Sequence, residues 1–126
     1  MRRASESRFT FKRTADDTVE CAFFGRVTPE ITEESAREVV RLLRERRARF
    51  YFCDATSVTA VAPSIAGPAA AGLKNILAEG VEEVIAVTPL SAARMLGMAI
   101  AFASRSPVRF FGDRQDALEY MARRRP

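Results

Sequence analysis

Residues 50–59 read Phe50-Tyr51-Phe52-Cys53-Asp54-Ala55-Thr56-Ser57-Val58-Thr59. The first four residues are all apolar and lack the alternation of a half-buried strand. Such a run is typical of a strand in the middle of a sheet that helices cover on at least one face. We expect this strand to end at Asp54. The segment therefore favours an α/β fold built around one central strand.

A β-hairpin and a helix are predicted ahead of this strand. Residues 9–23 alternate between apolar and polar side chains on either side of a turn at residues 15–17, which is the pattern of a hairpin. Thr28-Pro29 then supplies an N-cap hydroxyl and a proline at the first helical position. A helix is predicted from there to about residue 47.

Three strand-helix units complete the chain. The predicted strands are residues 50–53, 83–87 and 108–111, and the predicted helices are residues 68–79, a helix that Thr88-Pro89 opens and that runs through Ala103, and a last helix capped by Asp113 with Ala117, Leu118 and Met121 facing inward. Strands joined by helices are normally parallel with right-handed crossovers, so we predict one mixed sheet with helices packed against it. We expect a single domain over residues 1–126, with residues 1–7 and 124–126 flexible.

The types of residue present argue against catalysis. The chain has no histidine, which removes the commonest general base, the usual catalytic triads and the histidine-containing zinc sites. Cys21 and Cys53 lie in apolar runs without a Cys-x-x-Cys pair, so we interpret them as buried thiols. Asp54 stands alone, and we expect its carboxylate to hydrogen-bond the backbone of the following turn. We therefore predict no catalytic residue, no metal site, no cofactor and no enzymatic activity.

The net charge of +4 comes from clustered arginines. In the predicted helix of residues 29–47 the arginines alternate with glutamates, as on a solvated helix face. No recognition helix or aromatic platform accompanies them, so we expect no nucleic-acid partner. Prolines and glycines interrupt the long uncharged window of residues 55–73, and no apolar signal segment opens the chain. We therefore predict a cytoplasmic protein without a membrane span.

Three segments together carry a family resemblance. They are Phe24-Gly25-Arg26-Val27-Thr28, Phe52-Cys53-Asp54-Ala55-Thr56-Ser57-Val58-Thr59 and Phe110-Phe111-Gly112-Asp113-Arg114-Gln115-Asp116-Ala117-Leu118. The first is a strand end with a glycine that leads into a helix, the second an apolar strand with Asp before a turn, and the third a closing strand before an acidic helix start. In order and spacing they resemble the STAS family of anti-sigma factor antagonists over about residues 9–123. The resemblance implies the STAS fold and a regulatory role.

The resemblance also implies a candidate phosphorylation site. In the STAS family the loop after the third strand often reads Asp-Ser-Ser-Gly, and a partner kinase phosphorylates the second serine. The matching segment here is Ala62-Pro63-Ser64-Ile65, which places Ser64 at the acceptor position and differs at the other three. This makes Ser64 a candidate phosphoacceptor, and the candidate partner-binding residues in this loop are Ala62, Pro63, Ser64 and Ile65. From the residues alone, either Ser64 caps the following helix, or Gly67 caps it with Pro68 at its first position.

The predicted helix that ends at Ala103 is apolar around most of its circumference. A helical wheel gathers a core-facing set, Met95, Leu96, Ala99, Ile100 and Ala103, and an opposite set, Arg94, Met98, Ala101 and Arg105, with Phe102 at the edge. Either the second set forms an adaptable apolar patch with a basic rim, or the helix is wedged deeply into the core and only its arginines emerge. The first arrangement adds four candidate partner-binding residues: Arg94, Met98, Phe102 and Arg105.

We predict a non-enzymatic STAS-type interaction module, switch or scaffold. The partner would be a regulatory protein such as a kinase or an anti-sigma factor, or another copy of the chain. The alternative is a domain that binds a small ligand, a nucleotide or a lipid, at the carboxyl ends of the parallel strands. The sequence has no P-loop or Gly-x-Gly-x-x-Gly motif for a nucleotide.

Overall fold

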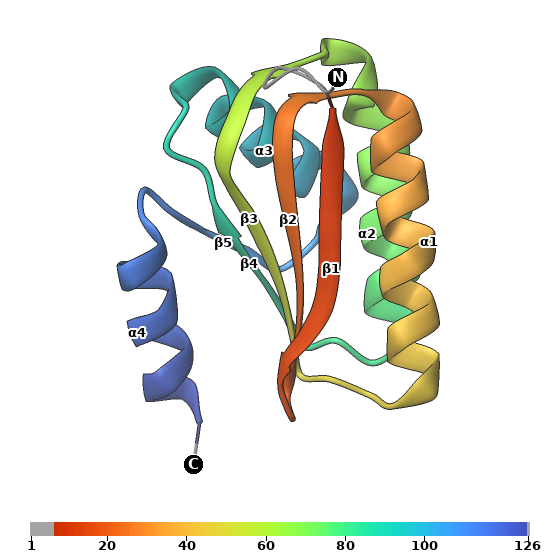
Figure 1. Cartoon of the computed structure of the whole chain (residues 1–126), viewed down its shortest axis with the longest axis vertical. Helices are drawn as coiled ribbons and strands as arrows, with labels where there is room; N and C mark the ends of the chain where they lie inside the picture. The colour runs from red at the N-terminus through yellow and green to blue at the C-terminus, as the bar shows by residue number, and fades with distance from the viewer. Residues whose placement is uncertain (1–6, 126) are drawn as a thin grey trace, which may run out of the picture.

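The computed structural model describes residues 7–125, and its five strands form one mixed sheet in the order β1-β2-β3-β4-β5 (Figure 1). The strands are β1 (Arg8–Ala15), β2 (Thr18–Val27), β3 (Phe50–Val61), β4 (Glu83–Val87) and β5 (Val108–Phe111). β1 is antiparallel to β2, and the other neighbouring strands are parallel. The structure confirms the predicted α/β domain, with a hairpin, a helix and three strand-helix units.

Helices cover both faces of the sheet. One face is covered by α1 (Pro29–Glu45), α2 (Ala66–Ala78) and α3 (Ser91–Ser104), which pack side by side with α2 in the middle. The other face is covered by α4 (Arg114–Arg124), which lies across the sheet from α1 and α2 in Figure 1. A short 3-10 helix, η1 (Pro63–Ile65), joins β3 to α2.

Side chains cap α1 and α4 as the sequence predicts. The Thr28 hydroxyl accepts a hydrogen bond from the backbone N–H of Ile31 at 3.3 Å, and the Asp113 carboxylate accepts one from Asp116 at 2.8 Å. The predicted start of α3 at Thr88-Pro89 was wrong, because the N–H of Thr88 donates to the carbonyl of Phe111 at 2.9 Å and so continues the sheet. The helix begins instead at Ser91, without a side-chain cap.

The prediction that β3 ends at Asp54 was also wrong. Asp54 lies opposite Val87, the last residue of β4, so it marks the end of the neighbouring strand. β3 itself continues to Val61 by pairing with β2 alone, through two register shifts at which β3 carries the extra residue. Gly25 lies in this region with a φ of 75°, a backbone conformation that favours glycine. The bulged pairing is what allows β3 to reach 12 residues.

Two apolar layers share β3. Phe50 and Phe52 are fully buried on the face covered by α4, where they pack with Met121. Tyr51 points to the opposite face and packs in the core beneath α1, α2 and α3. Because successive strand residues point to opposite faces, the uninterrupted apolar run predicted from the sequence serves both layers.

The inward face of α4 is narrower than the sequence predicts. Ala117 and Met121 are buried, whereas the side chain of Leu118 is 38% exposed. The prediction for Leu118 was therefore wrong. Residues 117 and 121 are one turn apart and pack in one cluster with Phe50 and Phe52 of β3 and with Ile85 and Val87 of β4.

Ion pairs connect the end of α4 to β4 and to the turn of the hairpin. Residues 1–6 and 126 lie outside the described part, so the flexibility expected for most of the two ends stays a prediction. Within the described part, Arg124 ends α4 and its guanidinium pairs with Glu83 at 3.0 Å. The guanidinium of Arg125 donates to both carboxylate oxygens of Asp17, at 2.8 and 3.0 Å. These hydrogen bonds lower the pKa of Asp17 below its ordinary value, although partial burial opposes the effect.

We expect Asp17→Asn to reduce stability at neutral pH by at most about 1 kcal/mol, because the Arg125 and Asp17 side chains are 35% and 30% exposed. The pKa of Asp17 is lowered on folding, so its contribution is present above the ordinary Asp pKa and is lost as the pH falls through the folded-state value. Denaturant melts of parent and variant should therefore converge toward acid pH. Asp16→Asn, at a fully exposed neighbour, is the control; a pH-independent difference for Asp17→Asn would contradict the ion pair.

Candidate partner-binding surface

The outer face of α3 exposes a stripe of large apolar side chains. Met95, Met98 and Phe102 are 72%, 52% and 87% exposed. Their spacing of three and four residues places them along one side of the helix. Contiguous exposed apolar side chains of this size usually mark a binding surface. Of the two arrangements left open by the sequence, the structure has the exposed patch.

Small residues seat α3 on the sheet. Its buried positions are Ala93, Ile100 and Ala101, and a Cβ atom at Gly97 would lie only 2.9 Å from the Phe110 ring of β5. The close approach at Gly97 fixes which side of α3 faces the sheet, and it leaves Met95, Met98 and Phe102 on the outside. The sequence-based wheel was therefore wrong in part: Met95, Ala99 and Ala103 are exposed, and Ala101 is buried.

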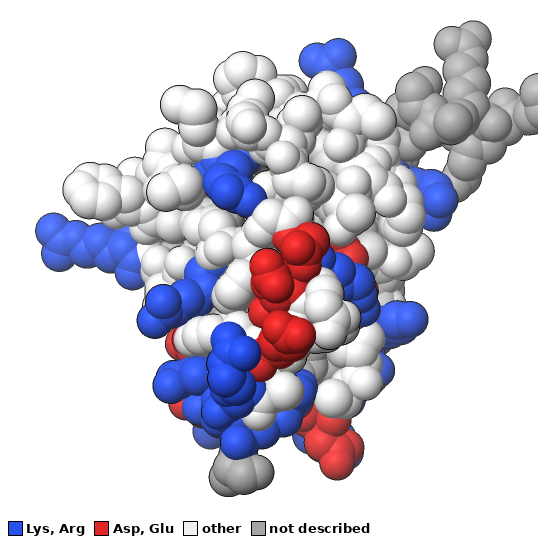
Figure 2. Space-filling view, turned by 90° about the vertical axis from the view of Figure 1, so that its left-hand side faces the viewer, with Lys and Arg blue, Asp and Glu red and all other residues white. Residues whose placement is uncertain are grey.

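The two predicted rim arginines differ in their roles. Arg94 is half-buried, and its Nε donates to the carbonyl of Thr88 at 3.2 Å, which holds the loop that leads into α3. Arg105 is exposed at the end of α3, where its φ of 54° turns the chain out of the helix. Arg105 is thus the predicted basic residue best placed to meet a partner. Figure 2 shows that the upper part of one side of the molecule is mostly uncharged with isolated basic side chains, while acidic and basic side chains gather below it.

The turn after β3 exposes two of its four candidate residues. Pro63 and Ser64 are exposed, whereas Ala62 and Ile65 are buried and anchor the turn. Neither predicted capping geometry occurs, because α2 begins at Ala66 and no side chain caps it. Pro68 is the third residue of α2, where its missing N–H costs nothing since first-turn N–H groups have no helical partner.

The candidate residues form two areas. The η1 turn packs against α1 and α2, and the exposed stripe lies on α3 beyond α2. Both follow the carboxyl ends of parallel strands, β3 and β4, and so start from the same end of the sheet (Figure 1).

A partly buried ion cluster, which the sequence did not predict, lies on the other face of the sheet. Arg114 of α4 donates to both carboxylate oxygens of Glu20 at 3.0 Å and to Asp54 at 2.7 Å. Asp54 also accepts a hydrogen bond from the backbone N–H of Thr56 at 2.8 Å, as its predicted structural role requires. No sequence spacing could have paired Arg114 with residues 94 and 60 positions away. Because these carboxylates are occupied by Arg114 and Thr56, the cluster fastens α4 to the sheet.

Arg114→Met should lower the free energy of unfolding by about 2 to 3 kcal/mol, because it leaves two nearly buried carboxylates unpaired. Arg114 is itself 42% exposed, which keeps the loss at the low end of the range for buried pairs. Urea melts give the loss, with Arg123→Met on the exposed side of α4 as control. The triple variant that adds Glu20→Gln and Asp54→Asn should recover part of it; a triple variant no more stable than Arg114→Met would contradict this account.

The two thiols belong to the core beneath α1, α2 and α3. Cys21 and Cys53 are unpaired cysteines, and burial raises the pKa of Cys53 to about 12 and that of Cys21 further. Such thiols stay protonated and unreactive at neutral pH. In the described part of the chain no group of three or more Cys, Asp or Glu side chains is arranged to hold a metal ion. Within residues 7–125 no helix is long and apolar enough to cross a bilayer.

Comparison with known proteins identifies the fold. The structure matches the anti-sigma factor antagonist SpoIIAA in its unphosphorylated form with a TM-score of 0.70 at 11% identity, over 91% of this chain and 96% of that chain. An anti-sigma factor antagonist from Mycobacterium paratuberculosis matches with a TM-score of 0.63 at 12% identity, over 95% and 97%. An uncharacterized DUF3478 protein with a SpoIIAA-like fold from Shewanella loihica PV-4 matches with 0.58 at 19% identity, over 90% and 92%. No family model and no curated protein matches the sequence. The chain therefore has the STAS fold.

Proposed function

We propose that this protein is a non-enzymatic, regulatory interaction module that docks a partner protein on the outer face of α3. The observation that carries the proposal is the exposure of Met95, Met98 and Phe102 along one side of the helix. The fold likeness to two anti-sigma factor antagonists supports a regulatory role. Methionine side chains adapt to the shape of a partner, and an exposed Phe supplies a large area to bury.

The charge around the stripe indicates the chemistry of the partner. Arg105 borders the stripe at the end of α3, and the protein as a whole is basic. A complementary surface therefore combines apolar side chains with carboxylates at its edge. A regulatory kinase, an anti-sigma factor or a similar protein is the proposed partner. Self-association is the alternative that centrifugation tests.

Ser64 is the proposed point of control. Its exposure on the η1 turn, immediately before α2, leaves the hydroxyl accessible to a kinase. One solved SpoIIAA structure of the same fold is in the phosphorylated form. A phosphate would add a charge of about −2 and three strong acceptor oxygens to the surface beside the first turn of α2. It would then repel a partner that carries carboxylates.

We expect Met98→Asp to weaken partner binding at least tenfold while changing the free energy of unfolding by less than about 1 kcal/mol, because the side chain is exposed. The partner is first captured from the native cell and identified by mass spectrometry, and its affinity for each variant is then measured by calorimetry. Analytical ultracentrifugation of the protein alone tests self-association. Leu118→Asp is the matched control, since Leu118 is an exposed apolar residue on α4. Loss of binding by both variants, or a loss of several kcal/mol of stability for Met98→Asp alone, would contradict the proposed surface.

Ser64→Asp should lower the affinity for the captured partner and leave the melting temperature nearly unchanged, because Ser64 is exposed and its hydroxyl caps no helix. Ser64→Ala should bind like the parent. Mass spectrometry of the native protein tests for phosphate on Ser64 itself. If both variants bind like the parent and no phosphate is found, the protein is a constitutive scaffold and the switch is absent.

A further inference from the structure

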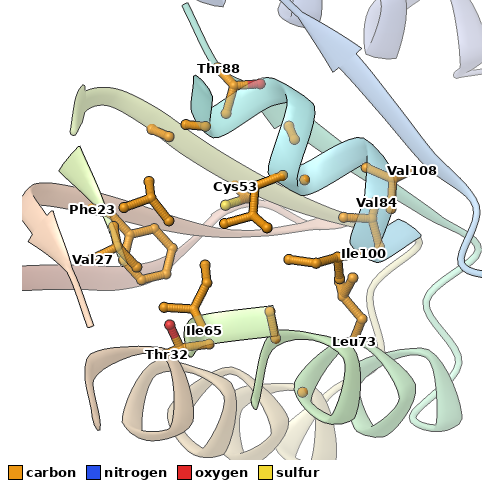
Figure 3. Close-up of a pocket in the computed structure, with 18 of the residues that line it drawn as sticks. Phe23, Val27, Thr32, Cys53, Ile65, Leu73, Val84, Thr88, Ile100 and Val108 are labelled. Carbon is orange, nitrogen blue, oxygen red and sulfur yellow. The ribbon is translucent and has the colours of Figure 1, made fainter. Parts of the chain in front are cut away.

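An apolar cavity of about 170 Å³ lies between the sheet and the layer of α1, α2 and α3 (Figure 3). Phe23 and Val27 lie at one end of the cavity, and Ile100, Val84 and Val108 lie at the other. The cavity is lined by residues of both layers, and among the described residues that line it none is charged. It is distinct from the outer surface of α3, where Met98 and Phe102 lie.

Small side chains on both layers leave this space open. Cys53 and Ala86 are adjacent in the register of β3 and β4, and the next residue along this row is Phe110 of β5. Ala69 of α2 and Ala93 of α3 line the cavity from the helical layer. These small side chains leave a gap between the two layers that the larger neighbouring side chains do not fill.

Cys53 lies in the wall of the cavity on the sheet side. It is only partly buried although it lies in the central strand beneath the helices, while its same-face neighbours Tyr51 and Ala55 are buried. All three residues line the cavity, and Cys53 is the one of them that is partly exposed. The raised pKa of the Cys53 thiol, about 12, agrees with apolar surroundings that disfavour a charge.

One polar group in the cavity wall has no partner. The Oγ1 atom of Thr88 is buried and makes no hydrogen bond within residues 7–125, and the residue is only 9% exposed. The other threonine of the wall, Thr32, donates to the carbonyl of Thr28 at 2.9 Å, and Ser35 donates to the carbonyl of Thr32 at 3.0 Å. A buried hydroxyl without a partner costs free energy that a ligand can recover.

We propose that this cavity binds one small, neutral, largely apolar molecule with a single hydrogen-bonding group, of the size of a phenol. An apolar cavity of about 150 Å³ in another protein stays dry and binds benzene, so the volume here suits one aromatic ring or a short aliphatic chain. The apolar body packs among the side chains of both layers, and the polar group meets the Thr88 hydroxyl. The absence of charge in the described wall argues against a nucleotide or a lipid head group here.

Titration of the full-length protein with phenol and with benzene tests the site. We expect both probes to shift the methyl resonances of Ile65, Ile100 and Val84 saturably, because these residues line the cavity. Met98→Asp should bind both probes like the parent, which keeps this test independent of the partner surface on α3.

Filling the cavity provides the decisive variants. Ala86→Leu adds three carbon atoms from the sheet, and Ala69→Leu adds them from α2. Each should weaken binding of both probes at least tenfold, and the melting temperature of each should stay level or rise because a void is filled. Ala122→Leu, at an exposed position on α4, is the control and should bind like the parent. If one filled variant does not fold, the other gives the answer.

Thr88→Val tests the hydroxyl. It should weaken phenol binding about fivefold, the equivalent of about 1 kcal/mol for one hydrogen bond, and leave benzene binding unchanged. The proposal is overturned if neither probe gives saturable shifts at the three methyl-bearing residues, if the filled variants bind like the parent, or if Thr88→Val keeps the parent affinity for phenol.

Discussion

Strand β3 carries apolar side chains on both of its faces, so helices must cover both faces of the sheet. The arrangement of the whole molecule follows from that requirement. Phe50 and Phe52 need cover on one face, and α4 supplies it. Tyr51 and Cys53 point to the other face, beneath α1, α2 and α3. The three helices that connect parallel strands, α1, α2 and α3, all lie on one face, because the strands follow chain order across the sheet. The other face is covered by α4, which follows the last strand. The Arg114 cluster fixes that lone helix by charge as well as by apolar contact.

A lone helix on one face also explains where polar groups are buried. α4 packs mainly against β4 and β5, and Glu20 of β2 meets the guanidinium of Arg114 at the start of the helix. The ring of Phe52 lies 4.9 Å from the same guanidinium, and this cation–π contact shields it. The Arg114 ion cluster thus covers the part of this sheet face that the apolar side chains of α4 do not cover.

The order of strands and helices and the caps at Thr28 and Asp113 could be predicted from the sequence, because each depends on residues close together in the chain. The length of β3 could not, since it depends on bulged pairing with β2, a strand far away in the sequence. The orientation of α3 was predicted wrongly for a related reason: a helical wheel gives most weight to large apolar residues, whereas Gly97 and its contact with Phe110 decide which side faces the sheet. The exposure of Met98 and Phe102 could nevertheless be predicted from the sequence, because α3 has more apolar residues than one face can bury.

α3 separates the internal cavity from the solvent by the thickness of one helix, about 10 Å. Leu96 and Ile100 face the cavity, and Met95 and Met98 lie on the adjoining outer surface of the same two turns. A rigid helix cannot move one of these surfaces without moving the other. Any displacement of α3 therefore couples ligand binding in the cavity to partner binding on the outer face of the helix. This coupling is reciprocal: the factor by which a bound ligand changes the affinity for the partner equals the factor by which the bound partner changes the affinity for the ligand.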